Sequence, residues 1–309
     1  MTDNYIMREP DGILIVDKPD GMTSHDVVWR VRKLFGTKKV GHTGTLDPMA
    51  TGVLVVLVGR AAKACEYVSH DEKSYQATLR LGLTTDTEDI TGTVLTRADP
   101  TVMPTAEQVQ AILPSFTGEI MQVPPMYSAL KVDGRKLCDI ARSGETVERA
   151  ARPVTVKSLT CAPHKTPDEY TLWATVSGGT YIRTLCADLG AALGCGGVMA
   201  SLRRTEAGGF SLADAHTLEQ LEAMSMEERL SCLRPVEELF ADHERLHLPD
   251  FFRTLCRNGC EIYLKKLGMS YPVGTRLRLC DASGQFFALG EVMEYEDGLA
   301  VKAIKIFVL

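Results

Sequence analysis

Hydrophobic and polar positions along the chain first predict a strand, a turn and a helix. A continuous apolar run at residues 13–16 precedes the sequence KPDG, whose proline and glycine favour a turn. Apolar residues then recur at helical spacing over residues 27–35, after a capping Thr23 or Ser24 and before Gly36, which can end a helix. The basic residues of this helix fall off the apolar stripe, so we expect them to face solvent or a partner.

The segments that follow show both the helical and the strand spacing of apolar residues. The apolar run at residues 53–58 predicts a buried strand, residues 60–70 suit a helix, and the alternation over residues 73–82 is typical of a half-buried strand. A polar loop is predicted at residues 84–92, and a capped helix over residues 106–113.

In the second half of the chain, the pattern of hydrophobic and polar residues changes twice. Residues 122–152 carry six bases and four acids without a clean core pattern, which predicts an excursion from the fold. Residues 169–194 predict a strand, a glycine turn and a helix, and residues 217–240 predict acidic helices. After Pro249, short alternating segments predict a small all-β barrel or sandwich of roughly 60 residues. We expect its boundary near residues 240–250.

The composition is that of a soluble globular protein, because 45% of the 309 residues are hydrophobic and 24% are charged. No apolar run approaches the ~20 residues that cross a membrane, so no membrane association is expected. Nine cysteines stand at irregular spacings without a zinc-finger pattern. Reduced thiols are therefore favoured over a disulfide framework, and a cytoplasmic location is expected.

The net charge of −6 argues against a nucleic-acid partner, but the distribution of charge does not. Residues 210–250 carry ten acids and three bases, a balance of −7, so the rest of the chain holds +1. Between Asp26 and Asp47 there is no acid, while five bases fall within residues 30–39. Local charge decides where a phosphate backbone can lie. The 30–39 cluster is thus a candidate RNA contact, and a solvated helix face is the alternative.

One carboxylate, Asp47, stands in a setting suited to presenting a side chain. The proline that follows it pushes its backbone out of the helical region. Gly41, Gly44 and Gly52 allow tight turns or a close approach to a ligand. We therefore expect Asp47 on a loop just before a buried strand, where a scaffold can present one functional group. The alternative is an Asx-turn acid that holds the loop together.

The stretch around this acid, GHTGTLDPMATGVL at residues 41–54, closely resembles the catalytic motif of bacterial TruB-type tRNA pseudouridine synthases. Other family-like blocks stand in the family's order: LIVDKPDGMTSHD, KSYQATLRLGLTTDTED, VPPMYSALKVDGRKL, GGTYIRTLCADLG and SLRRTEAGGF. The resemblance covers about residues 1–245. It is weaker over residues 249–309, where the family usually has a PUA-like RNA-binding domain.

The resemblance implies an α+β fold. A pseudouridine synthase-like catalytic domain with a mainly antiparallel central sheet would span residues 1–245, and a small β-rich PUA-like domain residues 246–309. Residues 122–152 would form an RNA-clasping insertion, which we expect to be mobile without RNA. The acidic residues 210–250 are expected to face away from the RNA.

The resemblance also assigns catalytic roles. Asp47 matches the family's essential aspartate, Tyr75 the tyrosine that packs on the target base, and Arg183 the arginine that pairs with the aspartate. Pseudouridylation breaks the N1–C1′ bond, turns the uracil and joins C1′ to C5. It is redox neutral, so neither cofactor nor metal is expected, and one anionic group suffices. Arg183 would keep that group ionised, and Tyr75 would stack on the base.

Three further residues are candidates for substrate binding. His42 matches a motif histidine that contacts the region of the flipped nucleotide, and Tyr181 and Leu202 match positions assigned to substrate binding. By residue type alone, these are a polar loop residue and two ordinary core residues. The joint match of the ordered blocks, not any one of these residues, is what favours the functional interpretation.

The implied activity is isomerisation of uridine 55 in the T loop of tRNA, with the target base flipped out of the loop. A stand-alone monomer is expected, with the T arm of tRNA as partner and no DNA, membrane or obligate protein partner. Three alternatives remain: a subunit of an RNA-guided particle, a tRNA-binding folding chaperone, and an unrelated hydrolase. The last has little support, because no nucleophile–His pair or second carboxylate accompanies Asp47 at a suitable spacing.

Overall fold

The larger part of the protein is built on a nine-stranded sheet. The computed structural model describes residues 9–68, 72–132 and 134–308. Across the sheet lie, in order, β1 (Gly12–Lys18), β3 (Thr51–Val58), β12 (Gly197–Ala207), β4 (Lys73–Leu81), β11 (Glu169–Val176), β10 (Arg152–Pro163) and β7 (Gly118–Gln122), with β2 (Val40–His42) beside β3 and β13 (Phe210–Ser211) beside β12. Within this sheet, the described strand pairs are antiparallel except for β12 with β3, so the predicted mainly antiparallel central sheet is confirmed.

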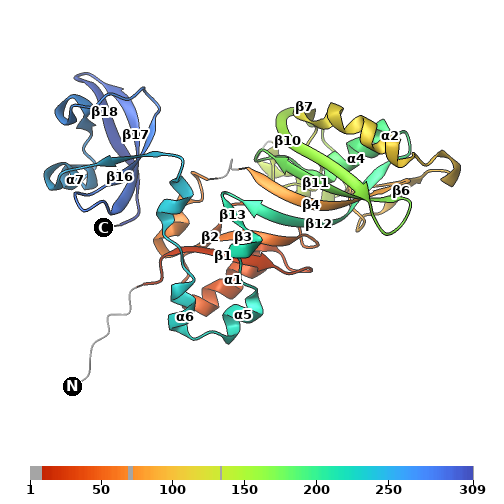
Figure 1. Cartoon of the computed structure of the whole chain (residues 1–309), viewed down its shortest axis with the longest axis horizontal. Helices are drawn as coiled ribbons and strands as arrows, with labels where there is room; N and C mark the ends of the chain where they lie inside the picture. Colours follow the sequence, from red (N-terminus) through yellow and green to blue (C-terminus); the bar gives the residue numbers. More distant parts are fainter. Residues whose placement is uncertain (1–8, 69–71, 133, 309) are drawn as a thin grey trace.

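The first strand and helix form as the pattern predicts. Helix α1 (Ser24–Phe35) begins after Thr23, which closes a capping box, and ends at Gly36 with a left-handed φ of 62°. Its apolar stripe packs against the β1–β3 pair. The predicted acidic helices are α5 (Leu218–Ala223) and α6 (Met226–Ser231), which lie beside α1 (Figure 1).

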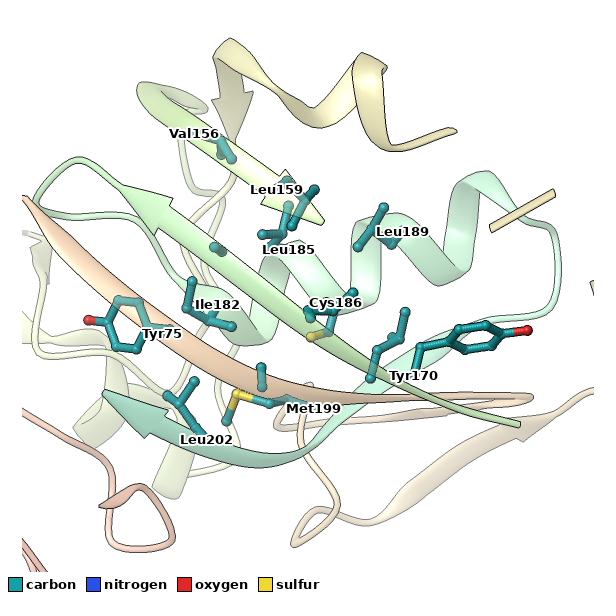
Figure 2. Packing of buried hydrophobic residues seen from close by; sticks show 14 of the residues in the cluster. Tyr75, Val156, Leu159, Tyr170, Ile182, Leu185, Cys186, Leu189, Met199 and Leu202 are labelled. Atoms are coloured by element: carbon teal, nitrogen blue, oxygen red, sulfur yellow. The ribbon is translucent and has the colours of Figure 1, made fainter. Parts of the chain in front are cut away.

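A second core lies under the other end of the sheet. Helix α4 (Ile182–Ala192) follows β11 through a glycine turn, as predicted, and its apolar side packs on β4, β11 and β12 (Figure 2). Helix α2 (Ala106–Ile112), capped by Thr105, contributes to the same cluster and continues as a 3-10 turn over Leu113–Phe116. This core supports the strands that carry Tyr75 and Leu202.

Two local predictions need correction. The helix predicted over residues 60–70 is a 3-10 segment, Gly59–Ala64, and residues 69–70 lie outside the described chain. A residue outside the segment stabilises it, because the Asp11 carboxylate accepts a hydrogen bond from the Ala61 amide at 2.8 Å. The polar loop predicted at residues 84–92 begins as a hairpin strand, β5 (Leu83–Thr85), which pairs with β6 (Val94–Arg97). Alternation is too short there to reveal a strand.

Residues 122–152 leave the main sheet after β7 and return to it as β10. Their elements are a two-stranded ribbon and one short helix: β8 (Lys131–Val132), β9 (Arg135–Lys136) and α3 (Leu137–Arg142). Leu137 and Ile140 are buried, whereas most of the described side chains around them are exposed. The segment is thus an excursion from the sheet, as its sequence pattern predicts.

The C-terminal part forms a separate five-stranded sheet (Figure 1). Its strands are, in order, β14 (Glu244–His247), β16 (Arg276–Cys280), β17 (Phe286–Tyr295), β18 (Gly298–Ile306) and β15 (Ile262–Tyr263). The prediction of an all-β unit is wrong in one element, because α7 (Asp250–Arg257) packs on this sheet. Its Phe252, Leu255 and Cys256 fall at helical spacing and enter the sheet's core.

The two sheets are joined by an apolar contact. Phe240, which precedes the C-terminal sheet, lies against Phe286 and Phe307 with ring centroids 6.0 and 5.6 Å away. These rings share one cluster with Ile13 and Ile15 of the first strand. The nine cysteines, all in the described chain, are free thiols. None of the described helices has the length and apolar character that crossing a membrane requires.

Candidate active site

Asp47 lies on the loop between β2 and β3, as predicted. The Ala50 amide donates to its carbonyl oxygen at 3.0 Å, so Asp47 opens a tight turn whose second residue is Pro48. Its carboxylate pairs with a guanidinium: Nε of Arg183 lies 3.0 Å from Oδ2. The Asp47 side chain keeps 37% of its surface exposed. Its carboxylate is therefore held by an arginine and accessible to a ligand, which favours the functional interpretation over an Asx-turn acid.

Two buried polar side chains hold the Asp47 loop from below. The Ser24 hydroxyl accepts from the Leu46 amide at 2.8 Å, which fixes the residue before Asp47 to the start of α1. The Lys18 ammonium donates to the Pro48 carbonyl at 3.0 Å and to the Pro19 carbonyl at 2.9 Å. Lys18 is fully buried, so the loop is anchored on both sides of the aspartate.

Arg204 is a second buried cation beneath the loop. Its Nε donates to the Val53 carbonyl at 2.7 Å and its Nη2 to the Gly44 carbonyl at 3.1 Å, while only 1% of its surface is exposed. No carboxylate in the described part of the chain forms an ion pair with it. Its own carbonyl oxygen crowds Gly52, whose φ is 100°; a Cβ there would come within 2.1 Å of that oxygen. Glycine is required where β3 meets β12.

Arg183 connects the aspartate to two other segments. It lies in the first turn of α4 with 6% of its side chain exposed. Its Nη1 donates to the Thr87 carbonyl at 3.1 Å, and its Nη2 donates to the Tyr127 carbonyl, at the start of the 122–152 excursion, at 2.8 Å. A second carboxylate, that of Asp89, lies 3.9 Å from Nη1. The guanidinium thus fixes Asp47 relative to both neighbouring loops.

The electrostatics of Asp47 are set mainly by burial. Burial raises the pKa of its carboxyl above the ordinary value, and the Arg183 guanidinium acts in the opposite direction. Nearby Asp89 adds to the increase and Lys18 opposes it. Arg183 therefore does not fully offset the effect of burial, which refines the expectation that it keeps the aspartate ionised. An aspartate with a raised pKa is suited to chemistry that exchanges a proton or forms a transient bond.

Tyr75 and Leu202 form an apolar wall beside this pair. They lie on the neighbouring strands β4 and β12 and belong to one cluster with Leu46, which precedes the aspartate. Figure 2 shows Tyr75 at the end of that cluster, with Leu202 and Ile182 nearby and its hydroxyl directed away from them. Both side chains are 8% exposed. An apolar wall of this kind can receive the face of a base.

Tyr181 is placed by a side chain that the sequence does not single out. The Gln122 amide group binds the Tyr181 backbone twice: its Oε1 accepts from the amide at 2.8 Å, and its Nε2 donates to the carbonyl at 3.0 Å. Gln122 is 2% exposed and ends β7. This double contact fixes the residue before α4, and hence the position of Arg183 two residues later.

His42 stands apart from the other candidates. It ends β2, and its ring meets the ring of His25 edge-on, with centroids 5.8 Å apart. Burial, with neighbouring His25 and Arg204, lowers the pKa of His42. Its Nδ1 is buried without a hydrogen-bond partner in the described chain. The structure thus pairs Asp47 with Arg183 and places Tyr75 and Leu202 in one cluster with Leu46, next to the aspartate. Tyr181 precedes the helix that carries Arg183, and His42 ends the strand that leads into the Asp47 loop.

The fold has solved counterparts. A chain in a crystal structure of a Cbf5–Nop10–Gar1 complex superposes with a TM-score of 0.75 at 25% identity, covering 98% of this chain and 86% of that one. One in an archaeal box H/ACA Nop10–Cbf5 complex gives 0.71 at 23% identity, covering 98% and 88%. The mainly antiparallel sheet with its separate C-terminal β-sheet domain is a pseudouridine synthase-like fold, as predicted.

Sequence comparisons identify the family. A model described as TruB family pseudouridylate synthase (N terminal domain) matches residues 32–182, and one described as tRNA pseudouridylate synthase B C-terminal domain matches residues 183–241. Proteins named tRNA pseudouridine synthase B are similar: that of Burkholderia mallei (strain NCTC 10247) is 42% identical, covering 93% of this chain and 95% of its own. That of Ruegeria pomeroyi is 45% identical, covering 86% and 85%. The chain belongs to the TruB family of pseudouridylate synthases.

Proposed function

We propose that the protein isomerises uridine 55 in the T loop of tRNA to pseudouridine, with Asp47 as its catalytic residue. The observation that carries this proposal is the 3.0 Å ion pair between the accessible Asp47 and the buried Arg183, beside the apolar wall of Tyr75 and Leu202. Family membership supports pseudouridylation, and the names of the relatives support tRNA as the substrate.

The reaction exchanges one bond to the ribose for another. The N1–C1′ bond breaks, the uracil turns, and C1′ joins C5; C5 loses a proton and N1 gains one, so atoms and electrons balance. Asp47 acts beside the ribose as nucleophile or proton acceptor. Arg183 holds its carboxylate in one orientation through a charge-assisted hydrogen bond. No cofactor or metal is part of this proposal.

The target base must leave the folded loop to reach Asp47, at a cost of a few kcal/mol. Tyr75 receives its face, and Leu202 with Tyr181 lines the space around it, which excludes water from the reacting ribose. His42 lies on β2, which leads into the Asp47 loop, and we assign it to the flipped nucleotide or its backbone. These roles rest on the match to the family motif and on the grouping of the side chains.

Residues 122–152 are proposed to clasp the RNA. The Arg183–Tyr127 hydrogen bond of 2.8 Å supports this, since it ties the base of the excursion to the catalytic pair. We further propose a catalytic domain over residues 1–245 and a PUA-like RNA-binding domain over residues 246–309, although β14, from Glu244, already belongs to the second sheet. A cytoplasmic, monomeric enzyme without an obligate protein partner completes the proposal.

The test is incubation of the purified full chain with an unmodified tRNA transcript in EDTA, followed by mapping of pseudouridine. A single modified uridine at position 55 is the expected result, and the Asp47→Asn variant serves as the matched negative control. Modification at another position would overturn the T-loop assignment. No modification by the intact chain would overturn the stand-alone activity.

A guided particle is the second candidate, because a structural counterpart at 25% identity was solved in a complex with two other proteins. In that case the bare transcript would stay unmodified until partner proteins and a guide RNA were added. A folding chaperone would instead bind tRNA tightly and leave its uridines unchanged, with the purified protein alone and also after partner proteins and a guide RNA are added. The pairing of the accessible Asp47 with the buried Arg183 favours catalysis over the chaperone, whereas the assay with bare transcript distinguishes the stand-alone enzyme from the guided particle.

A further inference from the structure

Helix α1 presents two different flanks to its surroundings. Its apolar stripe centres on the buried Val27, Val31 and Phe35. At about 100° per residue, Arg30 and Leu34 fall to one side of that stripe. His25, Trp29, Arg32 and Lys33 fall to the other side, and we call these four residues the β2 flank.

The flank of Arg30 is already occupied. Arg30 forms an ion pair with Glu222 of α5. The Leu34 carbonyl accepts from Nη1 of Arg229, in α6, at 3.1 Å. Figure 1 shows both acidic helices beside α1. The charge of Arg30 is therefore neutralised by the protein itself, although it belongs to the basic 30–39 cluster.

The β2 flank runs toward the active site. Nη2 of Arg32 donates to the Val40 carbonyl at 3.2 Å, so this side of the helix lies against β2. At its start, the His25 ring contacts His42 with centroids 5.8 Å apart. β2 leads directly into the Asp47 loop. From His25 to Lys33 the flank spans about 12 Å of helix, a length that can follow a short stretch of nucleic acid.

Trp29 is the large apolar side chain that this helix leaves outside. It is 53% exposed, whereas the other large apolar residues of α1 are buried or partly buried. The Lys33 ammonium lies 3.6 Å from the centre of its ring, which covers one face and leaves the side chain accessible elsewhere. The acid of this helix, Asp26, is held by Thr23 in the capping box. An exposed aromatic ring among cations is the arrangement that binds single-stranded nucleic acid.

We propose that the β2 flank binds the single-stranded nucleotides next to the target uridine. Trp29 stacks on one of their bases, and Arg32 and Lys33 contact the adjoining phosphates. The proposal rests on the proposed function, since it takes the RNA substrate as the occupant. Two observations support the proposal. The flank is continuous with His42, and it carries the cations Arg32 and Lys33 beside an exposed aromatic ring, with no acid of the described chain forming an ion pair with either cation.

A fluorescence titration tests the stacking directly. The chain has two tryptophans, and Trp173 lies on the sheet face opposite Tyr75, because its neighbour Ala174 pairs with Tyr75. In a Trp173→Phe background, the emission comes from Trp29 alone. We expect a T-arm stem-loop RNA to quench it in a saturable way. In the reciprocal Trp29→Phe background, the emission of Trp173 should stay unchanged.

Affinity measurements separate stacking from charge. Trp29→Ala should weaken RNA binding roughly five- to hundredfold, the range for a lost base–aromatic stack, and Trp29→Phe should recover much of it. Lys33→Ala should lower the slope of log K against log salt by about 0.7 to 1. Arg30→Ala and Trp173→Ala are the matched controls, with affinities within twofold of the parent chain.

The outcomes are distinct from those of the proposed function. An unquenched Trp29 and an unchanged affinity of Trp29→Ala, in an enzyme that still forms pseudouridine, would overturn this inference and leave the function standing. Trp29 would then be an exposed ring stabilised by Lys33. Quenching with loss of affinity in a chain that forms no pseudouridine would support the RNA surface and reject the activity. Equal losses in Trp29→Ala and Arg30→Ala would also count against it, because the effect would then be general to the helix.

Discussion

Arg183 and Asp47 form an asymmetric ion pair: the guanidinium is 6% exposed, the carboxylate is 37% exposed, and Nε lies 3.0 Å from Oδ2. The arginine is fixed from behind by the carbonyls of Thr87 and Tyr127. It cannot turn away without leaving both unpaired. The aspartate is thus oriented by a cation that is closed to solvent, and one side of the carboxylate remains open to a substrate.

Replacing Asp47 by asparagine should abolish pseudouridine formation and spare RNA binding, because the amide keeps the shape but provides no anion. The variant should also melt no lower than the parent chain at neutral pH. The raised pKa of Asp47 means that its ionised form is disfavoured in the folded state. Product mapping, RNA titration and thermal melting measure the three effects.

The difference in Tm between Asp47→Asn and the parent chain should depend on pH, because folding raises the pKa of Asp47. A carboxyl whose pKa is raised on folding costs stability when ionised, and the cost disappears as pH falls through the raised value toward 3.8. Any advantage in Tm of Asp47→Asn should therefore shrink on acidification. An advantage that grows as pH falls, or clear residual turnover of the variant, would contradict the assignment.

Replacing Arg183 by methionine should shift the acid limb of kcat/KM to higher pH. The guanidinium lowers the pKa of Asp47 against the effect of burial, so its removal leaves Lys18 as the remaining opposition to burial and Asp89. The pH–rate profile of Arg183→Met is the measurement, with Arg183→Lys as the charge-conserving comparison. Lysine should keep the limb near its original position but lower kcat, since it cannot reach both loop carbonyls. If the acid limb of Arg183→Met did not move, the ion pair would not determine the pH–rate profile.

The sequence predicts this region well where local pattern and ordered motif agree. The strand before Lys18, the capped α1 and the buried β3 follow from short-range periodicity, and the placement of Asp47 before β3 follows from its proline and glycines. Local rules decide such elements because each is specified by a run of residues that are neighbours in the chain.

The residues that support the site could not be predicted in this way. Lys18 and Arg204 are ordinary cations in the sequence, and nothing local shows that both are buried under the Asp47 loop. Gln122 reaches Tyr181 across 59 positions, a contact that only the tertiary fold creates. The alternating segments after Pro249 conceal helix α7, because its eight residues make little more than two turns and its amphipathic pattern is too short to stand out among them.

The 122–152 excursion should be cut readily by protease in the free protein and protected by tRNA. Its described ion pairs, such as Arg142–Asp139 and Arg135–Glu145, are exposed and contribute little stability. Leu137 and Ile140 are its buried apolar anchors. Limited proteolysis with mapping of the cut sites, with and without tRNA, measures the difference. Equal protection in both conditions would mean that the segment is ordered before RNA arrives.

Arg204 should act as a positioning residue for the Asp47 loop. It bridges the Val53 and Gly44 carbonyls from a buried site, so Arg204→Met leaves both acceptors unpaired, at about 1–3 kcal/mol for each. Removal of a buried unpaired charge offsets part of that cost. We therefore expect a modest loss in Tm but a drop in kcat of ~10²-fold, the scale of a displacement of about 1 Å, with little change in KM.

The neighbouring arginine provides the control for this prediction. Arg203 pairs with Asp17 at 2.7 Å, and its side chain is 40% exposed. Arg203→Met should lower Tm without the large drop in kcat. Arg204→Lys keeps one donor and should recover part of the rate. If both methionine variants lose kcat in proportion to Tm, Arg204 only stabilises the fold. A selective loss of kcat in Arg204→Met would mean that the second buried cation sets the geometry of the aspartate, because its hydrogen bond to Gly44 fixes the loop three residues before Asp47.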